Sequence, residues 1–218
     1  MSSGPQRPTL AVDCVLLGLG DEGLNLFCLR REDEPYLDQA VLPGGLLRLE
    51  ETLEQGCERL LREKTGFLPA RFRQIGAFDA LGRDPRGRVI SSAMLGLVNL
   101  EAADRDAGWR PLDAWKPMAF DHEKMARAGL SMLKALIAYQ PVAFELLGDK
   151  FSLGQLQRAY EAVLERPVDK RNFRRRALST NCLQSLTEHE KGVPHRAARL
   201  YRFDKRRAGL KSGPFTLV

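Results

Sequence analysis

The sequence lacks the features that mark secreted and membrane-spanning proteins. Only 4 of its 218 residues are cysteine, and these have neither the Cys-x-x-Cys spacing of a redox site nor the spacing of a zinc site. The first residues contain no apolar signal-peptide core, and no apolar stretch approaches the roughly 20 residues that a membrane helix requires. We therefore expect a soluble cytoplasmic protein without membrane contact, whose cysteines are reduced thiols in the core.

Carboxylates are missing from two positions of a glycine-rich segment that leads into an amphipathic helix. In this segment Gly45 is followed at fixed spacing by Glu51 and Arg59, and the pattern resembles the Nudix box. In that family two glutamates four residues apart lie on one helical face and hold the Mg²⁺ that bridges a diphosphate. The corresponding residues here are Leu60 and Lys64. A neutral and a cationic side chain cannot replace two carboxylates, so the resemblance implies a Nudix scaffold without metal ligands and without catalytic residues.

The helix of this segment is predicted from its own signals. Thr52 and Gln55 have the spacing of a capping box, apolar residues follow at helical intervals, and Gly66 suits a left-handed helix stop. Together they predict a helix over residues 53–64. Arg59 and Glu63 lie four residues apart in it, and we interpret them as a surface ion pair that stabilises the loop and the helix.

Charge is distributed unevenly along the chain, which favours two domains. Residues 151–218 hold 15 Lys and Arg against 6 Asp and Glu, whereas residues 1–150 hold 19 against 22. The net charge of +6 therefore comes from the C-terminal third, which suggests that only this part binds a polyanion. We place the joint between residues 140 and 151, with domains at residues 1–145 and 146–218.

The first domain combines strands with two long helices. Apolar, β-leaning stretches predict four strands, at residues 9–19, 24–29, 72–81 and 89–100. Asp121 is a suitable cap for a helix whose apolar residues recur at helical spacing up to Tyr139. Pro141 ends this helix, because proline lacks an amide donor and disfavours helical geometry in the residue before it. The pattern predicts an α+β body of Nudix type, an α/β/α sandwich.

The second domain has the element order of a winged helix-turn-helix. A capping box at Ser152 and Gln155 predicts a helix over residues 153–165, and Asp169 caps a basic helix over residues 170–178. Two strands at residues 183–187 and 199–203 can pair around a polar loop. The predicted architecture is therefore a Nudix-type domain followed by a C-terminal winged helix-turn-helix domain.

The basic helix has a chemistry that suits double-stranded DNA. Phe173 and Ala177 share one face, and the cations lie opposite or on its flanks. Guanidinium groups chelate guanine or clamp phosphates, and an asparagine pairs with adenine in the major groove. The predicted DNA-binding residues are Lys170, Arg171, Asn172, Arg174, Arg175 and Arg176, with His195 and Arg196 as wing contacts. A solvated basic face, or a helix that docks on an acidic partner, remain the alternatives.

Several segments together resemble the Nudix-related transcriptional regulators of bacterial NAD metabolism. They are the altered Nudix box and residues 83–89, 119–122, 151–157, 169–176 and 200–203. The resemblance implies a homodimeric repressor of NAD-metabolism genes that binds a palindromic operator in the bacterial nucleoid. It also implies ADP-ribose or a related NAD-derived nucleotide as effector, with no cofactor required. One departure is Ala197, where the family's wing usually has proline.

The expected nucleotide site combines the box with basic loops. The residues of the Arg-Asp-Pro-Arg-Gly stretch that match the family are Arg83, Asp84 and Arg86, and arginines over a Nudix cleft suit diphosphate or ribose oxygens. A turn-stabilising Arg–Asp pair is the structural alternative for them. The full predicted set is Arg31, Gly44, Gly45, Arg59, Glu63, Arg83, Asp84 and Arg86.

Two other functions stay open at this point. A divergent Nudix pyrophosphohydrolase could hold its metal through another set of glutamates, with the basic tail as a tether for nucleic acid or a partner; the candidates are Glu50, Glu51, Glu54 and Glu58. A regulator that has lost ligand sensing could act through its dimer alone. Residues 208–218 fit either a loosely held or a partner-dependent tail.

Overall fold

The computed structural model describes residues 7–100, 108–190, 197–209 and 215–218. The chain divides into two compact units, one of residues 1–18, 25–98 and 105–129, the other of residues 19–24, 99–104 and 130–218. Among the helices of the described residues, none is long and apolar enough to cross a membrane. The domain boundary between residues 145 and 146 stays a prediction.

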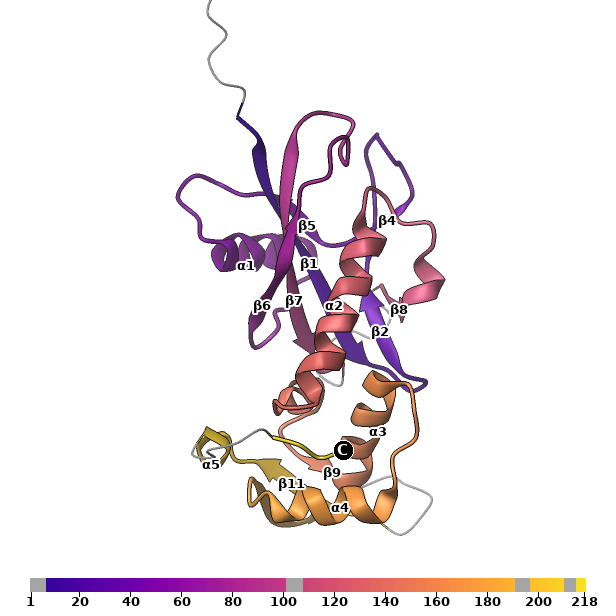
Figure 1. The fold of residues 1–218 in the computed structure, drawn as a ribbon, viewed down its shortest axis with the longest axis vertical. Helices are drawn as coiled ribbons and strands as arrows, with labels where there is room; N and C mark the ends of the chain where they lie inside the picture. Colours follow the sequence, from indigo (N-terminus) through magenta and orange to yellow (C-terminus); the bar gives the residue numbers. More distant parts are fainter. Residues whose placement is uncertain (1–6, 101–107, 191–196, 210–214) are drawn as a thin grey trace, which may run out of the picture. The chain divides into compact units, whose positions relative to one another are not determined.

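A mixed sheet forms the centre of the first unit (Figure 1). Its middle strand, β1 (Thr9–Leu19), is buried over most of its length and pairs in parallel with β7 (Val89–Val98). The strand order is β6-β7-β1-β2-β8, and β5 pairs with β1 off this path. The other strands are β2 (Leu24–Phe27), β5 (Gly44–Leu46), β6 (Phe72–Phe78) and β8 (Trp109–Pro111).

Two helices cover opposite faces of this sheet. They are α1 (Leu53–Lys64) and α2 (His122–Ile137). Gly56 of α1 lies against Val12, whereas Gly129 of α2 lies against Val15. Because side chains alternate along a strand, residues 12 and 15 of β1 point to opposite faces. The α/β/α sandwich expected from the sequence is therefore present.

Short elements that the sequence did not predict complete the first unit. Besides β5 and β8, they are the strands β3 (Leu29–Arg30) and β4 (Ala40–Val41), which pair with each other, and the 3₁₀ helix η1 (Leu112–Trp115). The strand expected at residues 24–29 is interrupted at Cys28, whose N–H donates to the Gly108 carbonyl instead. Elements of two to four residues carry too little periodicity to be recognised from sequence.

The box helix α1 follows its predicted signals. The Thr52 hydroxyl accepts from the Gln55 N–H and the Gln55 side chain accepts from the Thr52 N–H, which completes the capping box. Gly66 has φ of 74°, the left-handed conformation that favours glycine after a helix. Helix α2 also begins and ends close to prediction, but the Asp121 carboxylate before it is bonded to Arg83.

The second unit contains two helices and a small sheet. A capping box at Ser152 starts α3 (Leu153–Leu164), and the Asp169 carboxylate accepts from the Asn172 N–H to start α4 (Lys170–Ser179). The rings of Tyr160 and Phe173 meet edge to face and join the two helices. The remaining elements are η2 (Val142–Leu146), β9 (Phe151–Ser152), β10 (Leu183–His189), β11 (Arg199–Phe203) and α5 (Lys205–Gly209), with sheet order β10-β11-β9.

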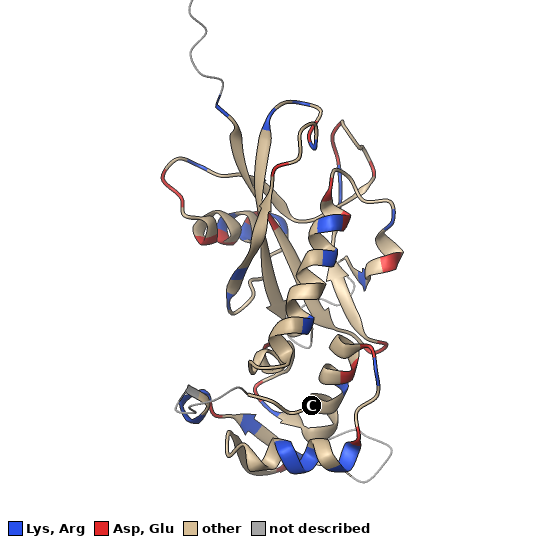
Figure 2. Cartoon of the chain, viewed as in Figure 1, with Lys and Arg blue, Asp and Glu red and all other residues tan. Residues whose placement is uncertain are grey.

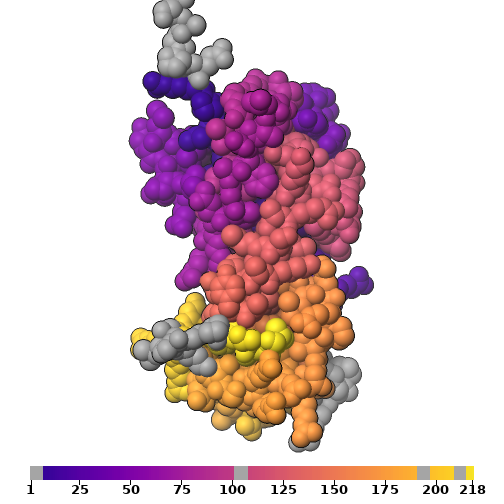
Figure 3. Space-filling model, viewed as in Figure 1, coloured from indigo at the N-terminus to yellow at the C-terminus, as the bar shows by residue number. Residues whose placement is uncertain are grey.

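The last residues of the chain pack into the second unit. Phe215 and Leu217 are buried, and the Phe215 N–H donates to the Tyr139 carbonyl. The Phe215 ring contacts those of Phe144 and Phe203, and Figure 3 shows the yellow C-terminal residues seated among orange residues of the same unit. Residues 215–218 are thus held by contacts within the fold. The four cysteines are free and buried, as expected.

Candidate functional sites

A polar cavity of about 250 Å³ opens at the end of α1 in the first unit. Its walls come from β1, β5, the last residue of α1, the β6–β7 loop and the start of α2. Six of the eight residues predicted for the nucleotide site line it, namely Arg31, Gly44, Gly45, Arg83, Asp84 and Arg86. Gly44 lets β5 approach β1 closely, since a side chain at this position would clash with Asp13 and the Val12 carbonyl.

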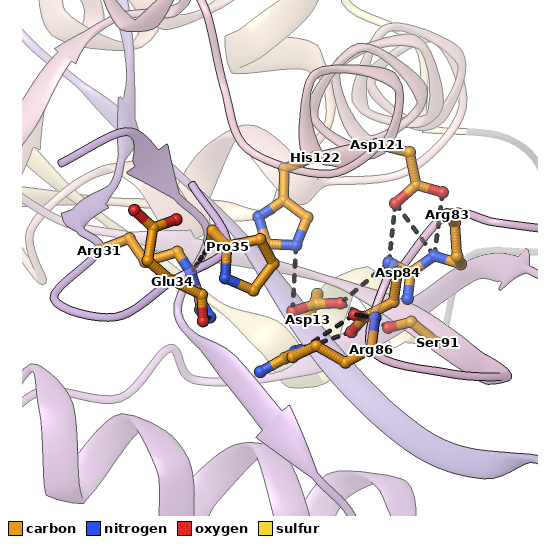
Figure 4. A network of polar contacts seen from close by, with 10 residues as sticks. All are labelled: Asp13, Arg31, Glu34, Pro35, Arg83, Asp84, Arg86, Ser91, Asp121 and His122. Carbon is orange, nitrogen blue, oxygen red and sulfur yellow. Dashed lines mark hydrogen bonds and ion pairs between the residues drawn. The ribbon is translucent and has the colours of Figure 1, made fainter. Parts of the chain in front are cut away.

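Arg83 is the buried centre of the polar network at this cavity (Figure 4). Its guanidinium donates to both carboxylate oxygens of Asp121, with a shortest distance of 2.7 Å, and its Nη2 lies 3.8 Å from Asp13. Asp13 also accepts from the Ser91 hydroxyl at 2.5 Å. Because each buried charge has an opposite charge beside it, the network is electrostatically satisfied and rigid.

Arg86 makes the turn-stabilising pair that was the alternative for this loop. Its Nε and Nη2 donate to the two oxygens of Asp84, and these bonds hold the pKa of Asp84 below its ordinary value. Arg83 takes no part in that pair because it reaches Asp121 instead. The guanidinium carbons of Arg86 and Arg31 lie 5.5 and 5.1 Å from the centre of the Phe120 ring. The ring and the two arginines therefore form one wall, by cation–π contact.

His122 is buried beside this network and is neutral. Its Nδ1 accepts from the Leu42 N–H at 3.0 Å, so the ring proton is on Nε2, which lies 3.6 Å from Asp13. Burial lowers the pKa of His122 below its ordinary value, and this effect outweighs the opposing one of Asp13. An uncharged imidazole at this position can donate one hydrogen bond from the cavity wall.

The box positions that hold metal in the hydrolytic family do not fit Mg²⁺ here. The Leu60 side chain is buried, and a side chain built on Gly45 would lie 2.8 Å from it. The Lys64 Nζ lines the cavity and donates to the Gly44 carbonyl at 2.6 Å. A divalent ion needs several oxygen ligands, and these positions offer a hydrocarbon and an ammonium. Among the residues that the structure describes, no three His, Cys, Asp or Glu side chains are grouped to hold a metal.

Arg59 and Glu63, also predicted for the nucleotide site, do not line the cavity. Arg59 is within 3.5 Å of Glu63, but it bonds mainly to both oxygens of Glu51 and to the Leu46 carbonyl. The Arg59 bonds lower the pKa of Glu51 to about 2. These contacts fasten the loop before α1 to the helix, which is the supporting role inferred from the sequence. The principal partner, Glu51, was not foreseen.

Among the residues of the cavity wall that were not predicted, four have polar or aromatic side chains. They are Asp13, Lys64, Phe120 and His122. Asp13 had a signal, because it is the lone carboxylate within an apolar strand. In the segment at residues 119–122, Asp121 is predicted as a helix cap, and Phe120 and His122 are identified only through the family resemblance. The sequence identifies Lys64 only as the replacement of a metal ligand, because its position relative to the cavity depends on the tertiary fold.

The basic helix α4 presents its predicted residues to solvent. Lys170, Arg171, Asn172, Arg174, Arg175 and Arg176 are all exposed, whereas Phe173 and Ala177 are buried. Figure 2 shows the blue positions along α4. Arg175 donates to the Asn172 carboxamide at 3.0 Å, and in the described part of the chain no carboxylate neutralises the α4 arginines. His195 and Arg196 lie outside the described residues.

The comparisons with known proteins agree with this arrangement. Residues 7–129 match the NUDIX domain family, and residues 143–203 match the NrtR DNA-binding winged helix domain. The fold and the sites thus define the class of protein, in which a Nudix domain is joined to a DNA-binding winged helix domain.

Three proteins are similar to the chain over most of their lengths. The ADPR-responsive transcriptional repressor NtrR of Acinetobacter baylyi is 27% identical over 206 residues, which cover 90% of this chain and 82% of that protein. NrtR of Shewanella oneidensis, crystallised with a 27mer DNA, is 30% identical with a TM-score of 0.82, and the match covers 92% of this chain and 95% of that chain. An ADP-ribose pyrophosphatase of Methanocaldococcus jannaschii is 32% identical over 126 residues, 56% of this chain and 72% of that protein.

The Nudix domain of the Shewanella oneidensis protein has also been crystallised with ADP ribose. This domain is 30% identical, with a TM-score of 0.53, and the match covers 59% of this chain and 90% of that chain. For the Shewanella oneidensis NrtR crystallised with DNA, the match extends through both domains. The chain belongs to the NrtR family of Nudix-related transcriptional regulators.

Proposed function

We propose that this chain is a transcriptional repressor that binds DNA through α4 and responds to the binding of ADP-ribose in its Nudix cavity. The observation that carries the proposal is the presence, in one chain, of a cationic cavity without Mg²⁺ ligands and an exposed helix with five basic side chains. The relatives support the proposal. One of them is an ADPR-responsive repressor. Another, the Shewanella oneidensis NrtR, has been crystallised with DNA, and its Nudix domain has been crystallised with ADP ribose.

The residues proposed to hold the nucleotide are those of the cavity wall. Arg31, Arg83 and Arg86 supply planar donor groups for phosphate and ribose oxygens. Gly44 and Gly45 are proposed to line the ligand site through their backbone, and Asp84 orients Arg86. Arg59 and Glu63 support the box from outside the cavity.

The DNA contacts are proposed for α4 and the wing. Arg171, Asn172 and Arg175 face solvent opposite the buried Phe173, so they are placed to reach both base edges and backbone phosphates. Lys170, Arg174, Arg176, His195 and Arg196 would hold phosphates beside them. A homodimer would place two such helices on the half-sites of a palindromic operator, about one helical turn or a multiple of it apart.

The regulated genes are proposed to be those of NAD metabolism, since ADP-ribose is a breakdown product of NAD. The protein would act on the bacterial nucleoid in the cytoplasm. ADP-ribose must bind the DNA-competent and DNA-incompetent arrangements with different affinity, because equal binding shifts no equilibrium.

The rival function is ADP-ribose hydrolysis, which the similarity to a pyrophosphatase favours. It requires a metal held by glutamates other than the two replaced ones. Leu60 and Lys64 argue against it, since neither stabilises a metal-bound water.

A two-part experiment tests the proposal. Calorimetry of the full chain against ADP-ribose, NAD and ATP identifies the effector, and fluorescence anisotropy on operator duplexes selected from a random pool measures DNA affinity with and without it. We expect ADP-ribose to bind and to change the Kd for the selected duplex at fixed salt. No preferred duplex at any ionic strength, or an unchanged Kd at saturating ADP-ribose, would overturn the proposal.

A further inference from the structure

Lys64 differs from Arg83 and Arg86 in what it contacts, and resembles Arg31, whose guanidinium donates to the backbone carbonyls of Pro35 and Glu34. Arg83 and Arg86 are each engaged by a carboxylate through two or more hydrogen bonds, so their charge is already compensated. The Lys64 Nζ contacts the Gly44 carbonyl, and within the described residues no carboxylate pairs with it. An ammonium has three donors, so one bond to a carbonyl leaves two for a ligand.

Lys64 occupies a position of the Nudix box where the hydrolytic family has a glutamate. It is the last residue of α1 and occupies the register of the final glutamate of the Nudix pattern. The first glutamate position of the pattern within the helix, four residues earlier, is Leu60, whose side chain is buried against Gly45. The helix therefore presents a fixed positive charge at the place where carboxylates would present a bound ion.

We propose that Lys64 binds the diphosphate of the nucleotide directly and replaces the divalent ion of the hydrolytic family, so that effector binding is independent of metal. This inference rests on the proposed function and assigns a ligand contact within it. A lysine interacts with phosphate as a point charge and supplies the attraction that an ion would otherwise supply. It cannot generate a metal-bound nucleophile, so the diphosphate is held without being cleaved. With Lys64 in place of a metal-binding glutamate, the protein senses its effector without consuming it.

The test is calorimetry of the full chain with ADP-ribose, in EDTA and in Mg²⁺. We expect the same Kd for the wild type in both buffers. Lys64→Gln removes the charge and should weaken binding by about 10- to 100-fold, the usual effect of losing a hydrogen bond from a charged group. Lys64→Arg keeps the charge and should remain closer to the wild type than Lys64→Gln.

Arg62→Gln is the matched control, because Arg62 is an exposed cation of the same helical turn that pairs with Glu58 and does not line the cavity. It should bind ADP-ribose as the wild type does. Thermal unfolding of each variant establishes that it is folded before binding is measured.

The outcomes separate this inference from the proposed function. Wild-type binding that disappears in EDTA, or Lys64→Gln binding as tightly as the wild type, overturns the role of Lys64 and leaves the repressor proposal intact. An equal loss of ADP-ribose affinity in Lys64→Arg and Lys64→Gln overturns the role of Lys64 as well, because the positive charge would then not be the cause of binding. Absence of wild-type binding in both buffers is the failure of the proposed effector, and the inference fails with it.

Discussion

Arg83 and Asp121 are joined beside the cavity of the first unit by three hydrogen bonds of 2.7 to 3.1 Å. The pair connects the β6–β7 loop to the residue before α2, 38 positions away in the sequence. Both side chains are largely buried, with 4% and 12% of their surface exposed. The geometry of the arginine-bearing loop therefore depends on the start of α2.

Asp121→Asn should destabilise the protein by about 2 to 4 kcal/mol, because the buried guanidinium of Arg83 loses most of its compensating charge. Chemical denaturation measures the free energy of unfolding. The control is Glu123→Gln, which removes an exposed pair with Arg127 and should cost less than about 1 kcal/mol. Equal effects of the two substitutions would show that the buried pair contributes no more than the surface one.

His122→Asn should reduce the loss of stability in mild acid. The pKa of His122 is lowered by burial from an ordinary value of 6.5, so below pH 6.5 the unfolded chain binds a proton that the folded chain does not. Wild-type stability therefore falls as pH drops below 6.5, by at most about 1.4 kcal/mol per pH unit from this group. The asparagine side-chain oxygen still accepts a hydrogen bond from the Leu42 N–H.

The measurement is the free energy of unfolding of both proteins from about one pH unit above to about one pH unit below 6.5, the ordinary pKa of a histidine side chain. The other histidines are common to the two proteins, so the difference between the curves isolates residue 122. Parallel curves would mean that His122 takes up its proton equally well in the folded state.

Arg171→Ala and Arg175→Ala should each weaken operator binding and reduce the slope of log K against log salt by about 1. Each arginine that contacts a phosphate releases counterions from the DNA. Replacing it with alanine therefore makes operator binding less dependent on salt concentration. Anisotropy titrations at several salt concentrations measure the slope. Arg62→Ala, on α1, removes the same charge from the first unit and should leave the slope unchanged. An unaltered slope in both α4 variants would remove these residues from the interface.

Phe173→Ala should destabilise the second unit by about 3 to 5 kcal/mol, because the ring is only 1% exposed and packs against Tyr160. Operator binding should weaken with it, since α4 loses its anchor. Leu178→Ala changes a half-exposed residue of the same helix and should have an effect within about 0.5 kcal/mol. Denaturant unfolding followed by circular dichroism distinguishes the two. A stable Phe173→Ala protein would show that α4 is held by other contacts.

Incubation with ADP-ribose and Mg²⁺ should give no turnover comparable to that of a Nudix hydrolase. The reason is the ammonium of Lys64 and the hydrocarbon of Leu60 in place of carboxylates. Chromatographic detection of AMP and ribose phosphate measures the reaction. Turnover that Glu51→Gln abolishes, while Glu123→Gln retains it, would favour the rival enzyme. Glu123 is the control because it lies on α2, outside the box, and does not line the cavity.

Local signals in the sequence determined the elements with their own caps and periodicity. The capping boxes at Thr52 and Ser152 and the cap at Asp169 each start a helix where predicted. These signals act between residues three or four apart, so they need no knowledge of the rest of the chain. The exposure of the α4 cations followed in the same way from the positions of Phe173 and Ala177.

The composition of the cavity was decided by the tertiary structure. Asp13, Lys64 and His122 lie far apart in the sequence, and sheet pairing and helix packing bring them to one wall. The same applies to the partner of Arg83, which is the distant Asp121 and not its neighbour Asp84. The sequence alone predicted a Nudix-type domain and a basic helix attached to it. Which side chains face the ligand depends on contacts between strands, loops and helices far apart in the chain, and such contacts leave no local pattern to read.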